Sequence, residues 1–166
     1  MQRTLIAVVD ATRARLIILT RTTLAEGGPG EELAELVDLA NPGRRLTQSE
    51  LFSDSRPGSS RVAGRGFAFD DHRDAHVAHL DSEFARAVTD AIARTLSDSG
   101  ASRLVLCASP RMLGTLRSTD LRPYGVAVQE IARDFSNLTL HQIQAHLVRL
   151  GLLPVPPPRA ALAVHA

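Results

Sequence analysis

The sequence predicts an α/β domain with a mixed five-stranded sheet and three main helices. Three apolar, strand-like runs come first, a long helical repeat follows, and two further apolar runs then alternate with helical segments. Consecutive strands favour an antiparallel meander, whereas strands separated by helices enter a sheet through right-handed crossovers. We therefore expect the order β-β-β-α-β-α-β-α, with the fourth and fifth strands parallel to the first.

The first three strands are marked by the turns between them. Apolar runs at 4–9 and 14–22 flank the polar sequence Asp-Ala-Thr-Arg, and this arrangement is typical of a β-hairpin. Asp10 is expected to close the turn by accepting backbone N–H groups two or three residues further on. The third strand is expected at about 35–40, before the turn Asn-Pro-Gly-Arg.

The second half of the domain alternates helices with strands. Apolar residues recur every three to five positions from about Asp74 to Ser97, which predicts a helix. The apolar run at 103–108 has the composition of a buried parallel strand, and Cys107 within it is expected to be a small buried hydrophobe. Ser109 is expected to cap a short helix that follows it.

The remaining elements complete a single domain. A fifth strand is expected at 126–131 and a last helix after Thr139, its expected N-cap. The domain then covers 1–153, with a long loop at 47–73, and a Pro-rich tail follows at 154–166. Loops of this length in a compact domain are uncommon and are typically functional or disordered.

The composition indicates a cytoplasmic protein. No apolar run approaches the roughly 20 residues of a membrane span, and charged residues interrupt the N-terminal run, so neither a membrane partner nor a signal peptide is expected. The single cysteine fits a reducing compartment. The formal net charge of +1 gives no whole-chain attraction to nucleic acid, so such binding needs a local patch. No pattern in the sequence indicates an oligomeric state.

Six stretches, spread in order over about residues 3–150, carry a family resemblance. They are VVDATRARLIIL, LVDLANPGRRL, SELFSDSRPG, FARAVTDAIARTL, RLVLCASPRMLGTLR and VQEIARDFSNLTLHQIQAHL. Together they resemble the bacterial host-attachment protein family, which is also described as a set of bacterial relatives of the central domain of archaeo-eukaryotic release factors. The resemblance implies an RNase H-like, release-factor-central-domain topology and a role connected with attachment to a host.

The resemblance also implies where function lies. In release factors the loop after the third strand carries Gly-Gly-Gln, which helps water attack peptidyl-tRNA, but the corresponding loop here has no such motif. We therefore expect a non-catalytic binding module with no catalytic residue and no cofactor. Glycine admits close backbone approach and guanidinium forks bind phosphate, so the loop is expected to contact the ribosome or structured RNA. The expected contacts are Arg56, Arg61, Gly64, Arg65, Gly66 and Arg73.

Two alternatives to RNA binding stay open. The same loop could support a peptidyl-tRNA or other ester hydrolase without the Gly-Gly-Gln motif. The protein could instead act through protein contacts in attachment to host cells, with the Pro-rich tail at 154–166 as the contact. A nuclease is not expected, because no set of carboxylates is predicted to converge on two metal ions.

Two further groups of polar residues have candidate roles. The stretches that most resemble the family contain Asp10, Arg13, Arg15, Asp134 and His141. These residues form either a shared polar surface near the strand ends or structural contacts, namely turn closure by Asp10 and a cap or ion pair that involves Asp134, and we favour the structural interpretation.

Three histidines, His72, His76 and His79, recur at helical spacing and are candidate Zn²⁺ ligands. We predict no metal there, because the acidic residues beside them are those expected in a first helical turn.

Overall fold

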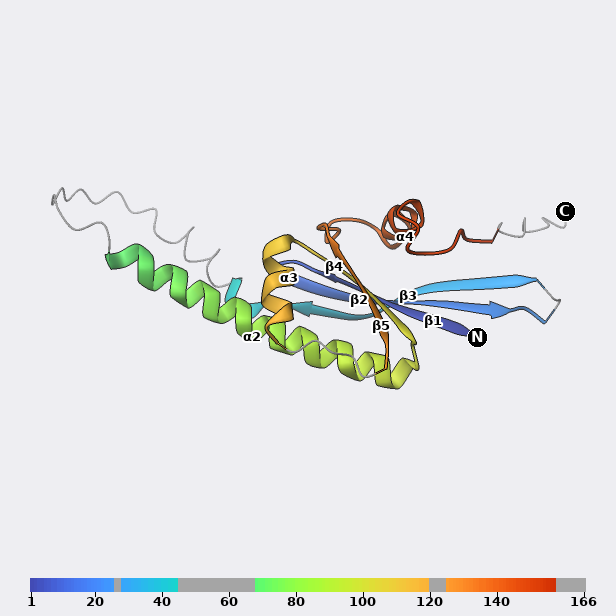
Figure 1. The fold of residues 1–166 in the computed structure, drawn as a ribbon, viewed down its shortest axis with the longest axis horizontal. Coiled ribbons are helices and arrows are strands. Elements are labelled where there is room, and N and C mark those ends of the chain that lie inside the picture. The colour runs from blue at the N-terminus through green and yellow to red at the C-terminus, as the bar shows by residue number, and fades with distance from the viewer. Residues whose placement is uncertain (26–27, 45–67, 120–124, 158–166) are drawn as a thin grey trace, which may run out of the picture.

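A computed structural model describes residues 1–25, 28–44, 68–119 and 125–157, with residues 68–74 described by their backbone only. Figure 1 shows the fold. The elements are β1 (Gln2–Val9), β2 (Arg13–Thr23), β3 (Pro29–Ala40), α2 (Ala68–Ser99), β4 (Arg103–Ala108), α3 (Pro110–Arg117), β5 (Ala127–Ala132) and α4 (Leu140–Arg149). This order of strands and main helices is the predicted one.

The five strands form one mixed sheet in the order β3-β2-β1-β4-β5. β2 runs antiparallel to both of its neighbours, whereas β4 is parallel to β1 and β5 is parallel to β4. These pairings confirm the predicted α/β class, with its meander and its two crossover units. They also give the strand order of the RNase H-like topology that the family resemblance implied.

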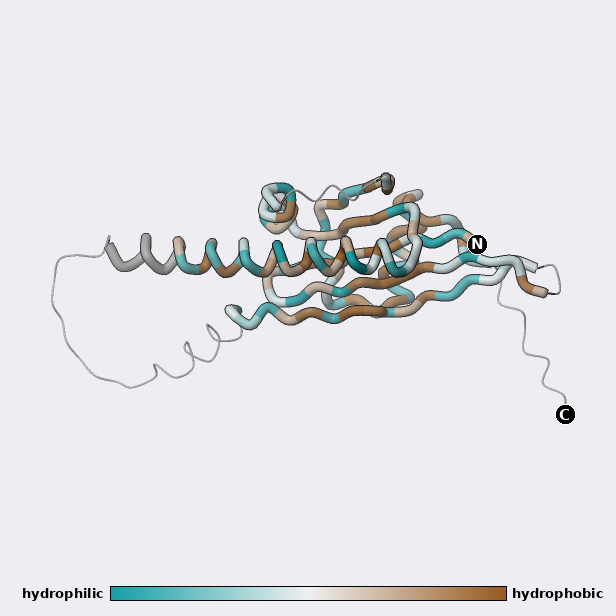
Figure 2. Tube along the Cα trace, turned by 90° about the horizontal axis from the view of Figure 1, so that it is seen from below, coloured by the Kyte–Doolittle hydropathy of each residue, from teal (hydrophilic) through white to brown (hydrophobic). Residues whose placement is uncertain are grey.

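Helices cover both faces of the sheet, and each face has its own apolar core. α2 and α3 pack against one face, which includes Leu5, Ala7 and Val9 of β1, and α4 packs against the other, which includes Ile6 and Val8 (Figure 1). Figure 2 shows the apolar stretches concentrated in the central strands. Because β1 and β4 are buried on both faces, their sequences read as continuous apolar runs rather than alternating ones.

Side-chain caps fix where α3 and α4 begin. Ser109 Oγ accepts the N–H of Met112 at 3.3 Å, ahead of Pro110 in the first turn. At α4, Thr139 Oγ1 accepts the N–H of Gln142 at 3.3 Å, and Gln142 Oε1 accepts the N–H of Thr139 at 2.9 Å. These contacts confirm the predicted caps at Ser109 and Thr139.

Two elements are longer than predicted. β3 begins at Pro29 rather than near Glu35, because it pairs with β2 along its whole length. α2 begins at Ala68 rather than near Asp74, so the last part of the predicted 47–73 loop is helical. Across the described residues, no helix has the length and apolar character needed to cross a membrane.

Candidate functional site

Asp10 closes the β1–β2 turn, as predicted. Its Oδ1 accepts the N–H of Thr12 at 2.6 Å, the Thr12 hydroxyl at 2.8 Å and the N–H of Arg13 at 2.7 Å. Burial acts to raise the pKa of Asp10, but these hydrogen bonds and one from the Ser136 side chain outweigh it, so the pKa lies below its ordinary value. A carboxylate held ionised in this way fixes a turn and is poorly suited to act as a general base at neutral pH.

Arg13 and Arg15 each bind a carboxylate of β3 through two hydrogen bonds. Arg13 contacts Asp38 at 2.6 Å from Nε and 2.8 Å from Nη2, and Arg15 contacts Glu35 at 3.0 and 2.8 Å. The first pair is exposed, with 44% of the Arg13 side chain and 51% of the Asp38 side chain accessible, whereas the Arg15 side chain is only 8% accessible. The hydrogen bond to Asp38 raises the pKa of Arg13. The two pairs have the same chemistry but differ in burial.

Arg15 also ties the strand pair to the connection between β5 and α4. Its Nη1 donates to the carbonyl of Leu138 at 2.7 Å and lies 3.4 Å from the carbonyl oxygen of Ser136. Hydrogen bonds from Arg15 lower the pKa of Glu35, against the effect of burial. The Glu35 carboxylate is therefore ionised at neutral pH, and the Arg15 guanidinium holds three segments of the chain together.

Asp134 and His141 belong to the connection between β5 and α4 and to the start of α4, respectively. Asp134 Oδ1 accepts the N–H of Ser136 at 2.9 Å, so this carboxylate caps the turn before α4. In the described structure the ion-pair partners of Arg13 and Arg15 are instead carboxylates of β3. His141 is exposed in the first turn of α4. The structure thus brings Asp10, Arg13 and Arg15 together at the end of the sheet where β1 finishes, in contacts that serve the fold.

The residues expected to contact RNA lie mostly outside the described part of the chain. Arg56, Arg61, Gly64, Arg65 and Gly66 all fall within residues 45–67, which are not described. Arg73 lies in α2, but its side chain is also outside the described residues. Their contacts stay predictions.

The histidine cluster gives no metal site in the described structure. His72 lies among the side chains that are not described, whereas His76 and His79 are exposed on α2. His79 Nε2 lies 3.4 Å from Oε1 of Glu83, one turn further along the helix. Among the residues whose side chains are described, no three metal-ligating groups gather in one place.

Cys107 is buried in β4, as predicted. Burial raises the pKa of its thiol to about 12. Nucleophilic attack requires the thiolate, so a thiol held protonated at neutral pH behaves as part of the apolar core.

Sequence reasoning missed an ion pair that anchors the chain as it leaves β3. Arg44 donates to the two carboxylate oxygens of Asp81, on α2, at 3.1 and 2.9 Å. Asp81 is only 4% exposed, and Arg111 Nη2 lies 3.6 Å from it. A sequence signal for this pair exists: an acidic residue stands on the apolar stripe of α2, one turn before Phe84, where a charge requires a partner. We call this contact the Asp81 clamp.

Asn41 fixes the same part of the chain to the β1–β2 turn. Its Nδ2 donates to the carbonyl of Ala11 at 2.8 Å, its backbone N–H donates to the carbonyl of Thr12 at 2.7 Å, and its Oδ1 accepts the N–H of Gly43 at 3.1 Å. A Cβ at Gly43 would lie 2.9 Å from the Leu80 side chain, so glycine lets the chain pass close to α2. The residues just before the 45–67 segment are therefore held on two sides.

Solved structures similar to this chain include three from Aquifex aeolicus: the type II variant of the Ppx/GppA phosphatase (10% identity, TM-score 0.36), the PPX-GPPA enzyme (10%, 0.35) and the family member of the Ppx/GppA protein family (12%, 0.33). The matched regions cover 79%, 78% and 78% of this chain, respectively. They cover only 36%, 36% and 35% of the lengths of those three structures.

No curated protein matches the chain. A family model described as "protein required for attachment to host cells" matches residues 5–147. This range takes in all of the sheet except the first three residues of β1, together with the capped start of α4. The chain therefore belongs to the host-attachment family.

Proposed function

We propose that the protein is a non-catalytic binding module that contacts structured RNA, with the ribosome as the preferred partner, through the Arg- and Gly-rich segment between β3 and α2. The observation that carries this proposal is the anchoring of that segment. The chain enters it from Arg44, which the Asp81 clamp binds to α2, and leaves it directly into the first turn of the same helix.

α2 extends well past the sheet at the end where it receives this segment. Figure 1 shows its N-terminal half running beyond the strands. The first buried side chain described on the helix is Asp81, and four of the six residues at 75–80 are exposed. The chain thus enters the segment from a fixed residue, Arg44, and leaves it at the start of a projecting helix, and we infer that this arrangement suits contact with a partner as large as the ribosome.

The charge of the segment supports a polyanionic partner. Residues 55–67 contain three arginines and no acidic residue, although the whole chain has a formal net charge of only +1. Guanidinium groups bind phosphate through paired hydrogen bonds, and glycines let the backbone approach a phosphate closely. Affinity that depends on phosphate contacts falls steeply with salt and shows little sequence preference.

The other polar groups of the domain favour binding over catalysis. Asp10, Arg13 and Arg15 are committed to closing a turn and joining strands. The thiol of Cys107 is buried and protonated. These groups are therefore used to maintain the fold, and the proposal assigns them no chemical step.

Sedimentation of the full-length protein with bacterial ribosomes tests the proposal. We expect binding at low salt that disappears at high salt, and binding at least about tenfold weaker after Arg61 and Arg65 are both changed to Ala, because each charge-assisted hydrogen bond contributes roughly 1.5–3 kcal/mol. The matched control changes Arg86 and Arg94 to Ala, two exposed arginines on α2. Equal binding by the two double variants would contradict the proposal.

The hydrolase alternative is distinguished by turnover. If the same protein released the peptide from peptidyl-tRNA, and Gly64→Ala or Arg65→Ala abolished the release, the segment would be catalytic and the binding-module proposal would be wrong.

A role in attachment through protein contacts is the second candidate, and the description of the family favours it. The Pro-rich tail at 154–166 is the expected contact. Deleting residues 158–166 keeps Val155, whose carbonyl accepts a hydrogen bond from Arg21. Loss of binding to host-cell surfaces in this variant, with ribosome binding unchanged, would support the second candidate.

A further inference from the structure

A cavity of about 370 Å³ lies at the end of the sheet opposite the Asp10 turn. It opens beside the amino ends of β1 and β4, on the face that α4 covers, and falls within the usual size range of small-molecule sites, about 300–1,000 Å³. Its lining includes Gln2, Thr4, Arg21, Arg103, Leu152 and Pro154.

Strand register places two arginines on either side of β1 in this cavity. Gln2 pairs with Arg21 of β2, and Thr4 pairs with Arg103 of β4. Residues two apart on a strand point to the same face, so Gln2 and Thr4 share the face of Ile6. Arg21 and Arg103 therefore lie on the same face of the sheet as Gln2 and Thr4, and all four residues line the cavity.

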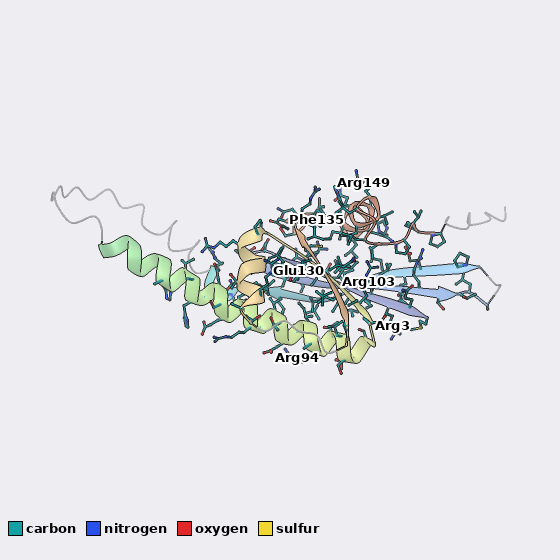
Figure 3. All side chains as sticks on the ribbon, in the orientation of Figure 1. Arg3, Arg94, Arg103, Glu130, Phe135 and Arg149 are labelled. Carbon is teal, nitrogen blue, oxygen red and sulfur yellow. The ribbon has the colours of Figure 1, made fainter. Side chains whose placement is uncertain are left out.

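The two arginines differ in how their charge is compensated. Arg21 donates from Nε to Glu31 at 2.8 Å and from Nη2 to the carbonyl of Val155 at 2.7 Å, so it is paired and also holds the chain after α4 in place. Arg103 donates from Nη2 to the side-chain oxygen of Gln129, a neutral amide. Among the described residues no carboxylate forms an ion pair with Arg103, so within that part of the chain the positive charge of Arg103 at the cavity has no acidic partner (Arg103 is labelled in Figure 3).

The opposite wall of the cavity is apolar and fixed. Leu153 is 4% exposed and belongs to the core under α4. The N–H groups of Leu152 and Leu153 both donate to the carbonyl of Leu147, at 2.9 and 3.3 Å. Gly151 turns the chain with a φ of 70°, which lets this wall fold back against the end of α4. The wall is therefore formed before any ligand arrives.

We propose that this cavity binds a small organic anion. Its phosphate or carboxylate group binds to Arg103, because a guanidinium fork matches the geometry of both oxyanions. Its less polar body lies against Leu152 and Pro154. The cavity is large enough for a molecule of about mononucleotide size, and the site is separate from the segment proposed to contact RNA.

Calorimetric titration of the full-length protein tests the proposal with three probes: inorganic phosphate, adenosine monophosphate and succinate. We expect at least one probe to bind, with amide NMR shifts concentrated at Thr4, Arg103 and Leu152. Stronger binding of adenosine monophosphate than of succinate identifies a phosphate ligand, and the reverse identifies a carboxylate. Failure of all three probes to bind at 10 mM would overturn the proposal.

Two variants show whether Arg103 carries the affinity. Arg103→Gln should weaken binding at least about tenfold, and Arg103→Lys, which keeps the charge but loses the fork, should weaken it less. The matched control is Arg94→Gln, an exposed arginine on α2, on the other side of the sheet (Figure 3). Equal affinity in Arg103→Gln and Arg94→Gln, at unchanged thermal stability, would also overturn the proposal.

Discussion

Replacing Arg15 with methionine removes a guanidinium that joins β2, β3 and the connection before α4. The Arg15 side chain is 8% accessible, and it binds both oxygens of Glu35 and the carbonyl of Leu138. Methionine fills a similar volume, so the substitution acts mainly on charge and hydrogen bonding. It removes the hydrogen-bonded partner of the Glu35 carboxylate, in a site where only 25% of that side chain is accessible, and leaves it only Arg13 Nη2, 3.7 Å from Oε1.

The size of the loss follows from this burial. Breaking a buried ion pair by removing one partner costs about 3–5 kcal/mol. Water can reach part of the Glu35 carboxylate and replace some of the lost bonds, so we expect about 2–4 kcal/mol in the free energy of unfolding. For a domain of this size each kcal/mol shifts Tm by about 2–4 °C, which corresponds to a fall of roughly 5–15 °C.

Urea unfolding followed by circular dichroism measures the effect, with Arg13→Met as the matched control. Arg13 makes the same two-bond contact with Asp38, but both partners are largely exposed, and such surface pairs contribute about 0–1 kcal/mol. Both variants should keep the urea m-value of the wild type. A loss below about 1 kcal/mol in Arg15→Met, or an equal loss in Arg13→Met, would refute the argument that burial sets the cost.

Four further predictions concern single positions. The hydrogen bond from Arg15 lowers the pKa of Glu35 in the folded state. The stability that the ionised carboxylate contributes is therefore present above the ordinary pKa of 4.5 and is lost as pH falls through the lower folded value. The difference in unfolding free energy between pH 7 and pH 3 should be smaller in Glu35→Gln than in the wild type. Thr139→Ala removes the capping box of α4 and should cost about 1 kcal/mol in urea unfolding, whereas Thr139→Ser should cost little; equal losses would contradict the capping assignment. Gly100→Ala should destabilise by about 1 kcal/mol because its φ is 63°, while Gly114→Ala, inside α3 with nothing within 4 Å of the added Cβ, should stabilise by up to about 1 kcal/mol; the same sign at both sites would show that backbone conformation does not decide the effect. Cys107 should react with a thiol reagent only at the rate of unfolding, and fast labelling of the native protein would contradict its burial.

The fold could be predicted from the sequence where a local pattern reports burial. β1, β2 and β4 are buried on both faces and read as unbroken apolar runs, and Ser109 and Thr139 act as caps through contacts only three residues away. The start of α2 could not be predicted in this way. Helical periodicity appears only where a helix packs against a core, and the described residues of α2 before Asp81 are not buried.

The same distinction separates the polar contacts that were predicted from those that were not. Asp10 binds groups two and three residues away, so its role follows from local turn chemistry. Arg15 lies opposite Asp38 in the strand register but binds Glu35. The register of β2 and β3 shifts between Leu16 and Ile17, which moves Glu35 along the pair toward Arg15. A bulge of this kind has no sequence signature strong enough to place it.

The two ends of the sheet use arginine in opposite ways. In open α/β sheets, ligands usually bind beyond the carboxyl ends of the parallel strands. Near that end, Arg15 donates its hydrogen bonds to Glu35 and to backbone carbonyls. At the amino end, Arg103 lines an open cavity and donates to the neutral amide of Gln129. Substitution of Arg15 should therefore lower stability and reduce ligand binding only through unfolding, whereas substitution of Arg103 should reduce binding at nearly constant stability. The difference follows because, in the described part of the chain, Arg15 has a carboxylate partner whereas Arg103 has only a neutral amide.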